Sequence, residues 1–78
     1  MVSSLVLRLA QDESGDRACE ALSRDPRILL GGRKGTFLPV VTEVGSLREG
    51  QTLAEEISAL HGVLGVDLVQ AYWESTDA

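Results

Sequence analysis

The chain has 78 residues, which suffice for one hydrophobic core and leave nothing for a second. Its formal net charge of −5 argues against nucleic acid and anionic lipid as partners, because those surfaces are bound by basic patches. The single cysteine, Cys19, excludes an internal disulfide, and no apolar stretch approaches the roughly 18 residues of a membrane span. We expect one cytoplasmic domain over residues 1–74, with no secretory signal before it, and a polar tail over residues 75–78.

The chain begins with a predicted strand and a short helix. Residues 2–9 are mostly aliphatic, without the gaps of a helical period, and predict a strand that ends at the polar cluster of residues 11–15. Residues 16–23 carry apolar side chains at helical spacing, with acids early in the segment. They predict a short amphipathic helix, which the Asp25-Pro26 pair ends.

A hairpin is predicted next. Ile28–Leu30 and residues 36–44 are apolar, and the glycine-rich segment of residues 31–35 separates them. Proline removes a backbone donor, so Pro39 in the second of these strands predicts a bulge. The glycine-rich segment resembles a phosphate-binding loop only superficially, because it leads into a strand and lacks the terminal Lys-Ser/Thr pair.

The last third of the chain predicts a helix and a final strand. Residues 46–49 and residues 52–55 both match the capping-box pattern of a helix start, and Gly50 favours the second. His61-Gly62 is expected to end the helix, and residues 63–73 predict a strand. The order is therefore βαββαβ, an α+β fold of the ferredoxin-like, split βαβ type. Two helices cover one face of its four-stranded antiparallel sheet and leave the other face open.

Strand alternation predicts which side chains lie on the open face, because successive residues point to opposite sides of a sheet. The leucines of residues 5, 7 and 9 are assigned to the core, together with Leu38, Val40, Val44, Val66 and Leu68. Phe37 and Pro39 are assigned to the open side. Two-sided apolar strands indicate that the second face is covered at least part of the time, and the alternative is that small sheets expose some valine routinely. The candidate binding residues on this face are Ser4, Val6, Arg8, Val41, Glu43, Asp67, Val69 and Ala71.

The residue types needed for catalysis or metal binding are sparse. The single histidine, His61, has no cysteine or second histidine at ligand spacing, and Cys19 fits best as a small apolar residue of the first helix. The chain contains no asparagine, which an acylphosphatase-like site on this fold would need. We expect no enzymatic activity, no metal and no cofactor.

Three segments together resemble the NapD family of small cytoplasmic chaperones. They are Val2-Ser3-Ser4-Leu5-Val6, the glycine-led strand from Gly35 to Glu43, and the segment from Gly62 to Val69. The resemblance implies a ferredoxin-like chaperone that binds the twin-arginine signal peptide of an exported molybdoenzyme, the catalytic subunit of the periplasmic nitrate reductase. Such a protein delays export until the enzyme has matured.

On this hypothesis Val6, Val41, Val69 and Ala71 contact the apolar stretch of the peptide, and Glu43 and Asp67 meet its arginines. Two alternatives stay open. One is a small-molecule-sensing regulatory domain of the ACT type, which shares the βαββαβ order. The other is a homodimeric interaction module that buries the open face between two copies.

Overall fold

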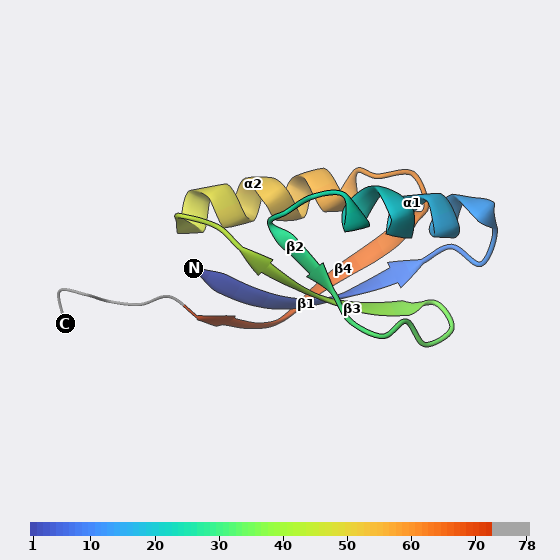
Figure 1. The fold of residues 1–78 in the computed structure, drawn as a ribbon, viewed down its shortest axis with the longest axis horizontal. Coiled ribbons are helices and arrows are strands. Elements are labelled where there is room, and N and C mark those ends of the chain that lie inside the picture. The colour runs from blue at the N-terminus through green and yellow to red at the C-terminus, as the bar shows by residue number, and fades with distance from the viewer. Residues whose placement is uncertain (73–78) are drawn as a thin grey trace, which may run out of the picture.

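The computed structural model describes residues 1–72, with the exception of the side chains of Ala71 and Tyr72. Four antiparallel strands form one sheet in the order β2-β3-β1-β4, and both helices pack on the same side of it (Figure 1). The elements are β1 (Val2–Leu9), α1 (Glu13–Ser23), β2 (Ile28–Leu30), β3 (Phe37–Glu43), α2 (Leu47–Ser58) and β4 (Val63–Tyr72). The ferredoxin-like prediction is confirmed. Trp73 and the polar tail lie outside the described residues.

The core lies between the sheet and the two helices. Every second residue of β1 and β3 faces the helices, which is the alternation that the sequence predicts. The helices meet these strands with one apolar stripe each. Leu7, Leu9, Leu38, Val40 and Ile57 are the largest side chains that are fully buried.

Helix α1 starts three residues earlier than predicted. The carboxylate of Asp12 caps it by accepting hydrogen bonds from the hydroxyl of Ser14 and from the backbone N–H of Ser14, the latter at 2.9 Å, and these bonds lower the pKa of Asp12. Gly15 lies inside the helix, where a Cβ atom would be 2.0 Å from the carbonyl oxygen of Ala10. The polar cluster of residues 11–15 is therefore a helix cap and first turn. The glycine allows the helix to approach the end of β1.

Helix α2 also starts earlier than predicted, at the first of the two capping boxes. The hydroxyl of Ser46 accepts a hydrogen bond from the backbone N–H of Glu49 at 3.1 Å, and the Glu49 carboxylate accepts one from Gly45 at 3.3 Å. Gly50 lies within the first turns of the helix, close to Val44 and Met1. The prediction that Gly50 favours the second capping box as the start of the helix was wrong, because Ser46 caps the helix at the first box and Gly50 follows inside it.

Pro39 causes no bulge, so that prediction was wrong as well. The register between β1 and β3 runs without a shift through the pair Val6–Pro39. The Pro39 carbonyl accepts a hydrogen bond from Gly31 at 2.7 Å, so the backbone of Pro39 faces the β2 side, beyond the last paired residue of β2. Proline cannot return a hydrogen bond to Gly31, and the paired residues of β2 end at Leu30, so the missing N–H falls where the β2–β3 pairing stops.

The glycine-rich segment before β3 is a tight turn. Lys34 and Phe37 exchange two backbone hydrogen bonds of 2.9 Å around Gly35, which has a φ of 59°. Arg33 forms an ion pair of 2.7 Å with Asp16 of α1, which ties the turn to the helix layer. None of the helices in the described part of the chain is long and apolar enough to cross a membrane.

Candidate functional site

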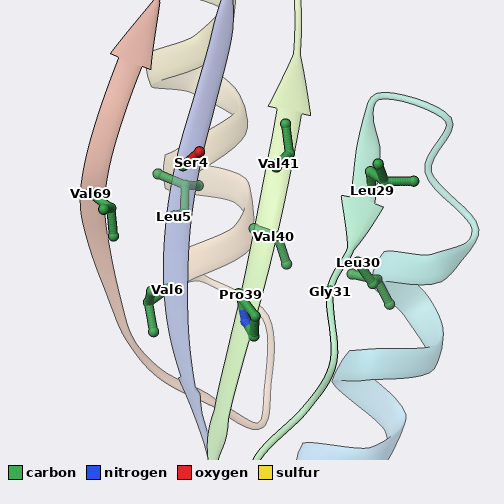
Figure 2. Close-up of a pocket in the computed structure, with 10 residues that line it drawn as sticks. All are labelled: Ser4, Leu5, Val6, Leu29, Leu30, Gly31, Pro39, Val40, Val41 and Val69. Atoms are coloured by element: carbon green, nitrogen blue, oxygen red, sulfur yellow. The ribbon is translucent and has the colours of Figure 1, made fainter.

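The side of the sheet that carries no helix is hollowed over its centre. A depression of about 260 Å³ lies across β1, β3, β2 and the neighbouring part of β4. Figure 2 views the sheet from this side, and the side chains that border the depression come from all four strands. Its apolar border consists of Val6, Leu29, Pro39, Val41 and Val69.

Several of these apolar side chains are largely exposed. Leu29 is 71% exposed, Val69 is 62% exposed and Val41 is 37% exposed. One solvated face of an antiparallel sheet usually carries polar residues, and burial of apolar area contributes about 25 cal/mol per Å². A partner that covers this face would therefore gain free energy from a surface that is already assembled.

The structure brings four of the predicted binding residues together. Ser4, Val6, Val41 and Val69 all line the depression. The register places Arg8 opposite Gly65, with its guanidinium above that glycine. Arg8 therefore lies on the open face but outside the depression, as do the two predicted acids.

Glu43 and Asp67 lie on the two strands that flank β1, Glu43 on β3 and Asp67 on β4. Glu43 pairs with Val2 across β3, and Asp67 pairs with Val6 across β4. Four residues along the sheet and two strand spacings separate their Cα atoms by roughly 16 Å, from a rise of about 3.3 Å and a spacing of about 4.8 Å. Both are exposed, and none of the ion pairs formed within residues 1–72 involves Glu43, Asp67 or Arg8. A ligand with two cations could therefore meet one carboxylate with each.

The alternation predicted for the last strand is interrupted. The β1–β4 register shifts between Ser4 and Leu5, where Val69 stands as an extra residue between Leu68 and Gln70. Val69 borders the depression on the open face, in agreement with the prediction. Ala71 lies opposite Ser3, and its side chain belongs to the part that the structure does not describe.

Two exposed side chains of the open face were not among the predicted site residues. Leu29 borders the depression and pairs with Val41, and Phe37 is 52% exposed at the start of β3. Leu29 could have been found, because alternation in Ile28–Leu30 places it on the side opposite Ile28.

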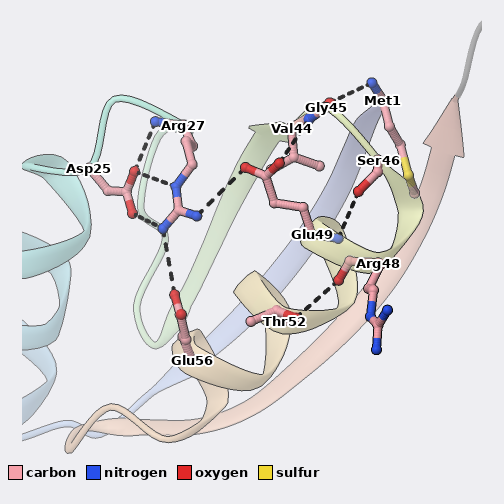
Figure 3. A network of polar contacts seen from close by, with 10 residues as sticks. All are labelled: Met1, Asp25, Arg27, Val44, Gly45, Ser46, Arg48, Glu49, Thr52 and Glu56. Atoms are coloured by element: carbon pink, nitrogen blue, oxygen red, sulfur yellow. Dashed lines mark hydrogen bonds and ion pairs between the residues drawn. The ribbon is translucent and has the colours of Figure 1, made fainter.

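A polar network lies away from this face, between the start of β2 and helix α2 (Figure 3). Arg27 contacts Asp25 at 2.8 Å, Glu56 at 3.5 Å and Glu49 at 3.9 Å. Hydrogen bonds from the side chain and backbone of Arg27 lower the pKa of Asp25, and the same pair raises the pKa of Arg27. The network joins β2 to the helix layer and has a structural role.

Neither the histidine nor the cysteine considered for catalysis or metal binding lines the depression. His61 is exposed in the turn between α2 and β4, and Cys19 is half-buried in α1, where it packs against the core. Within residues 1–72, no three histidine, cysteine, aspartate or glutamate side chains gather as a metal site would require.

The element order, the strand order and the one-sided helix layer define a ferredoxin-like domain with an open apolar face. Among solved structures, the solution structure of the E. coli Tat proofreading chaperone protein NapD is similar to the chain, with a TM-score of 0.79 and 24% sequence identity. The match covers 97% of this chain and 81% of that one, so the resemblance to NapD extends over the whole fold. No family model and no curated protein sequence matches the chain.

Proposed function

We propose that the chain is a cytoplasmic chaperone that binds the twin-arginine signal peptide of an exported molybdoenzyme. The proposed client is the catalytic subunit of the periplasmic nitrate reductase, whose export the chaperone delays until maturation is complete. The observation that carries this proposal is the apolar depression on the open face, with two exposed acids, Glu43 and Asp67, that form no ion pair within residues 1–72. The similarity of the fold to a Tat proofreading chaperone supports it.

A signal peptide of this class combines an apolar stretch with two adjacent arginines, and the open face offers a counterpart to each. The apolar stretch would cover Val6, Val41 and Val69, together with Leu29. Each guanidinium would form a charge-assisted hydrogen bond with one carboxylate, Glu43 or Asp67. Binding and release of a peptide need no catalytic group, so the proposal includes neither an enzymatic activity nor a cofactor.

Isothermal titration calorimetry with a twin-arginine signal peptide tests the proposal. The control peptide carries two glutamines in place of the arginines. Exposed ion pairs contribute up to about 1 kcal/mol each, so we expect the loss of both arginines to weaken binding by about 5- to 30-fold. Equal affinities for the two peptides would contradict the role of the acids, and the absence of heat with both would contradict the function.

Substitution of the acids assigns that effect to residues. In a chain with Glu43→Gln and Asp67→Asn, we expect the twin-arginine peptide to bind as weakly as the glutamine peptide does. Glu55→Gln is the matched control, because Glu55 is an exposed acid of α2 on the other side of the sheet. A loss of affinity in the Glu55 variant equal to that of the double variant would show that net charge acts in place of local contacts.

A further inference from the structure

A second hollow lies on the helix side of the sheet, between α2 and β4. Its volume of about 420 Å³ exceeds that of the open-face depression and is within the range of about 300–1,000 Å³ found for ligand sites. Leu47 and Ala54 of α2 form one wall, and Val66 and Leu68 of β4 form the other. Leu68 is 64% exposed although it is on the side of the sheet that the helices cover. We call this hollow the helix-side groove.

The floor of the helix-side groove carries two hydroxyl groups. Ser3 and Thr42 are a cross-strand pair, 6% and 3% exposed, and both line the groove. Neither hydroxyl forms a hydrogen bond with another described residue. Within residues 1–72, every side-chain oxygen or nitrogen that is sealed from solvent has a hydrogen-bond partner. Because these two hydroxyls have none, they are not sealed, and they open into the groove. An apolar ligand that covered them without a hydrogen bond would lose about 1–3 kcal/mol for each.

The groove borders an edge of the sheet, because β4 is the last strand in the sheet formed by residues 1–72. The Pro39 carbonyl faces β2, so the pair Val6–Pro39 exchanges no hydrogen bonds and the backbone of Val6 faces β4. Asp67 pairs with Val6, and its backbone groups point back toward β1. The backbone groups of its neighbours Val66 and Leu68 therefore point outward, beside the groove that their side chains line.

We propose that the β4 edge and the helix-side groove bind an extended segment of a partner polypeptide. The segment adds a strand beside β4 and places a tryptophan or tyrosine side chain in the groove. Main-chain hydrogen bonds to Val66 and Leu68 hold the segment, and every second side chain points to the helix side. The ring fills the apolar walls, and its N–H or O–H bonds a hydroxyl of Ser3 or Thr42.

The charges of this surface favour a segment without acids, because Glu55 stands at the rim and the chain carries a net charge of −5. A second copy of the chain fits this edge less well. A two-fold pairing of β4 strands centred on Asp67 would set two carboxylates directly opposite each other, which is destabilising. The site is separate from the open face, so it leaves the proposed signal-peptide surface uncovered.

Nuclear magnetic resonance titration of the full chain with capped pentapeptides tests this proposal. The peptide has the sequence Thr-Val-Trp-Val-Thr, and the matched peptide has phenylalanine at its centre. We expect shifts of the amide signals of Ser3, Thr42, Val66 and Leu68, and about 3- to 10-fold tighter binding of the tryptophan peptide. Equal affinities, or shifts confined to the open face, would overturn the proposal, and so would a titration without shifts.

Substitutions separate this site from other occupants. Leu68→Lys should weaken binding at least 10-fold. Leu29→Lys changes a leucine of similar exposure on the opposite edge strand and should leave binding unchanged. Thr42→Val should remove part of the preference for tryptophan over phenylalanine. Trp73→Ala should leave the affinity unchanged. Tighter binding by the Trp73 variant would show that the chain's own tryptophan occupies the groove. Concentration-dependent dimerisation that Leu68→Lys abolishes would show that a second copy occupies it. Either result overturns the proposal.

Discussion

Replacement of Val41 by threonine tests the open face without a large change in shape. Val41 is 37% exposed, so the fold already buries about two thirds of it and a bound peptide would cover the rest. Full burial of a valine contributes about 1.5–3 kcal/mol, so the remaining third contributes about 0.5–1 kcal/mol. A hydroxyl covered without a partner costs about 1–3 kcal/mol more. The expected loss in binding is about 2 kcal/mol, or about 30-fold in Kd.

The assay is the calorimetric titration with the twin-arginine peptide. In the free protein the threonine hydroxyl of the variant reaches solvent, so we expect the free energy of unfolding to change by less than about 1 kcal/mol. The control is Val66→Thr, the same chemical change on the helix side of the sheet, which should leave the Kd unchanged. A Kd for Val41→Thr within twofold of the original, or an equal loss for Val66→Thr, would refute the reasoning.

Three further predictions concern stability. Gly62→Ala should lower the free energy of unfolding, measured by urea denaturation, by at least about 3 kcal/mol. The reason is that Gly62 has a φ of 100° and that a Cβ there would be 2.0 Å from the Ser14 carbonyl oxygen. A loss under about 1 kcal/mol would contradict this prediction. Arg27 lowers the pKa of Asp25, so the fold should lose about 1 kcal/mol as the pH falls below about 4, and Asp25→Asn should remove that dependence in acid titrations. Pro39→Ala should cost only about 0.5–1 kcal/mol in thermal unfolding, through the entropy of the unfolded chain; a larger loss would mean that the proline has a specific packing role.

The sequence predicts the strand faces well where alternation is regular. In β1 and β3 each buried residue is flanked by residues on the other face, so Leu5 and Val40 were placed in the core and Val6 and Val41 on the open side. A period of two needs only the order of apolar residues, which a single sequence supplies.

The predictions failed where close tertiary contacts override local preference. Gly15 and Gly50 disfavour a helix when they are read in sequence, yet both lie within helices. The missing Cβ of Gly15 makes room for the Ala10 carbonyl, and the Ser46 cap starts α2 before Gly50 is reached. Pro39 is tolerated because β2 ends before it can pair there, which depends on the length of a neighbouring strand. Close contacts and the lengths of neighbouring strands are properties of the assembled fold, so the local sequence does not predict them.

The register shifts of β4 limited the prediction of the site for the same reason. An extra residue between Leu68 and Gln70 changes which later residues face outward, and nothing in the order of residues 63–72 marks its position. Leu29 was within reach of the same reasoning, because alternation in Ile28–Leu30 places it on the side opposite Ile28, and it was missed because that alternation was not applied to this short strand.

The account depends on occupation of the open face by a signal peptide, and a map of amide shifts on addition of a twin-arginine peptide measures this directly. We predict the largest shifts at Val6, Leu29, Val41 and Val69, with small changes at Leu53 and Ile57 beneath the helices. Shifts concentrated along β4 and α2 with the open face unchanged would contradict the account.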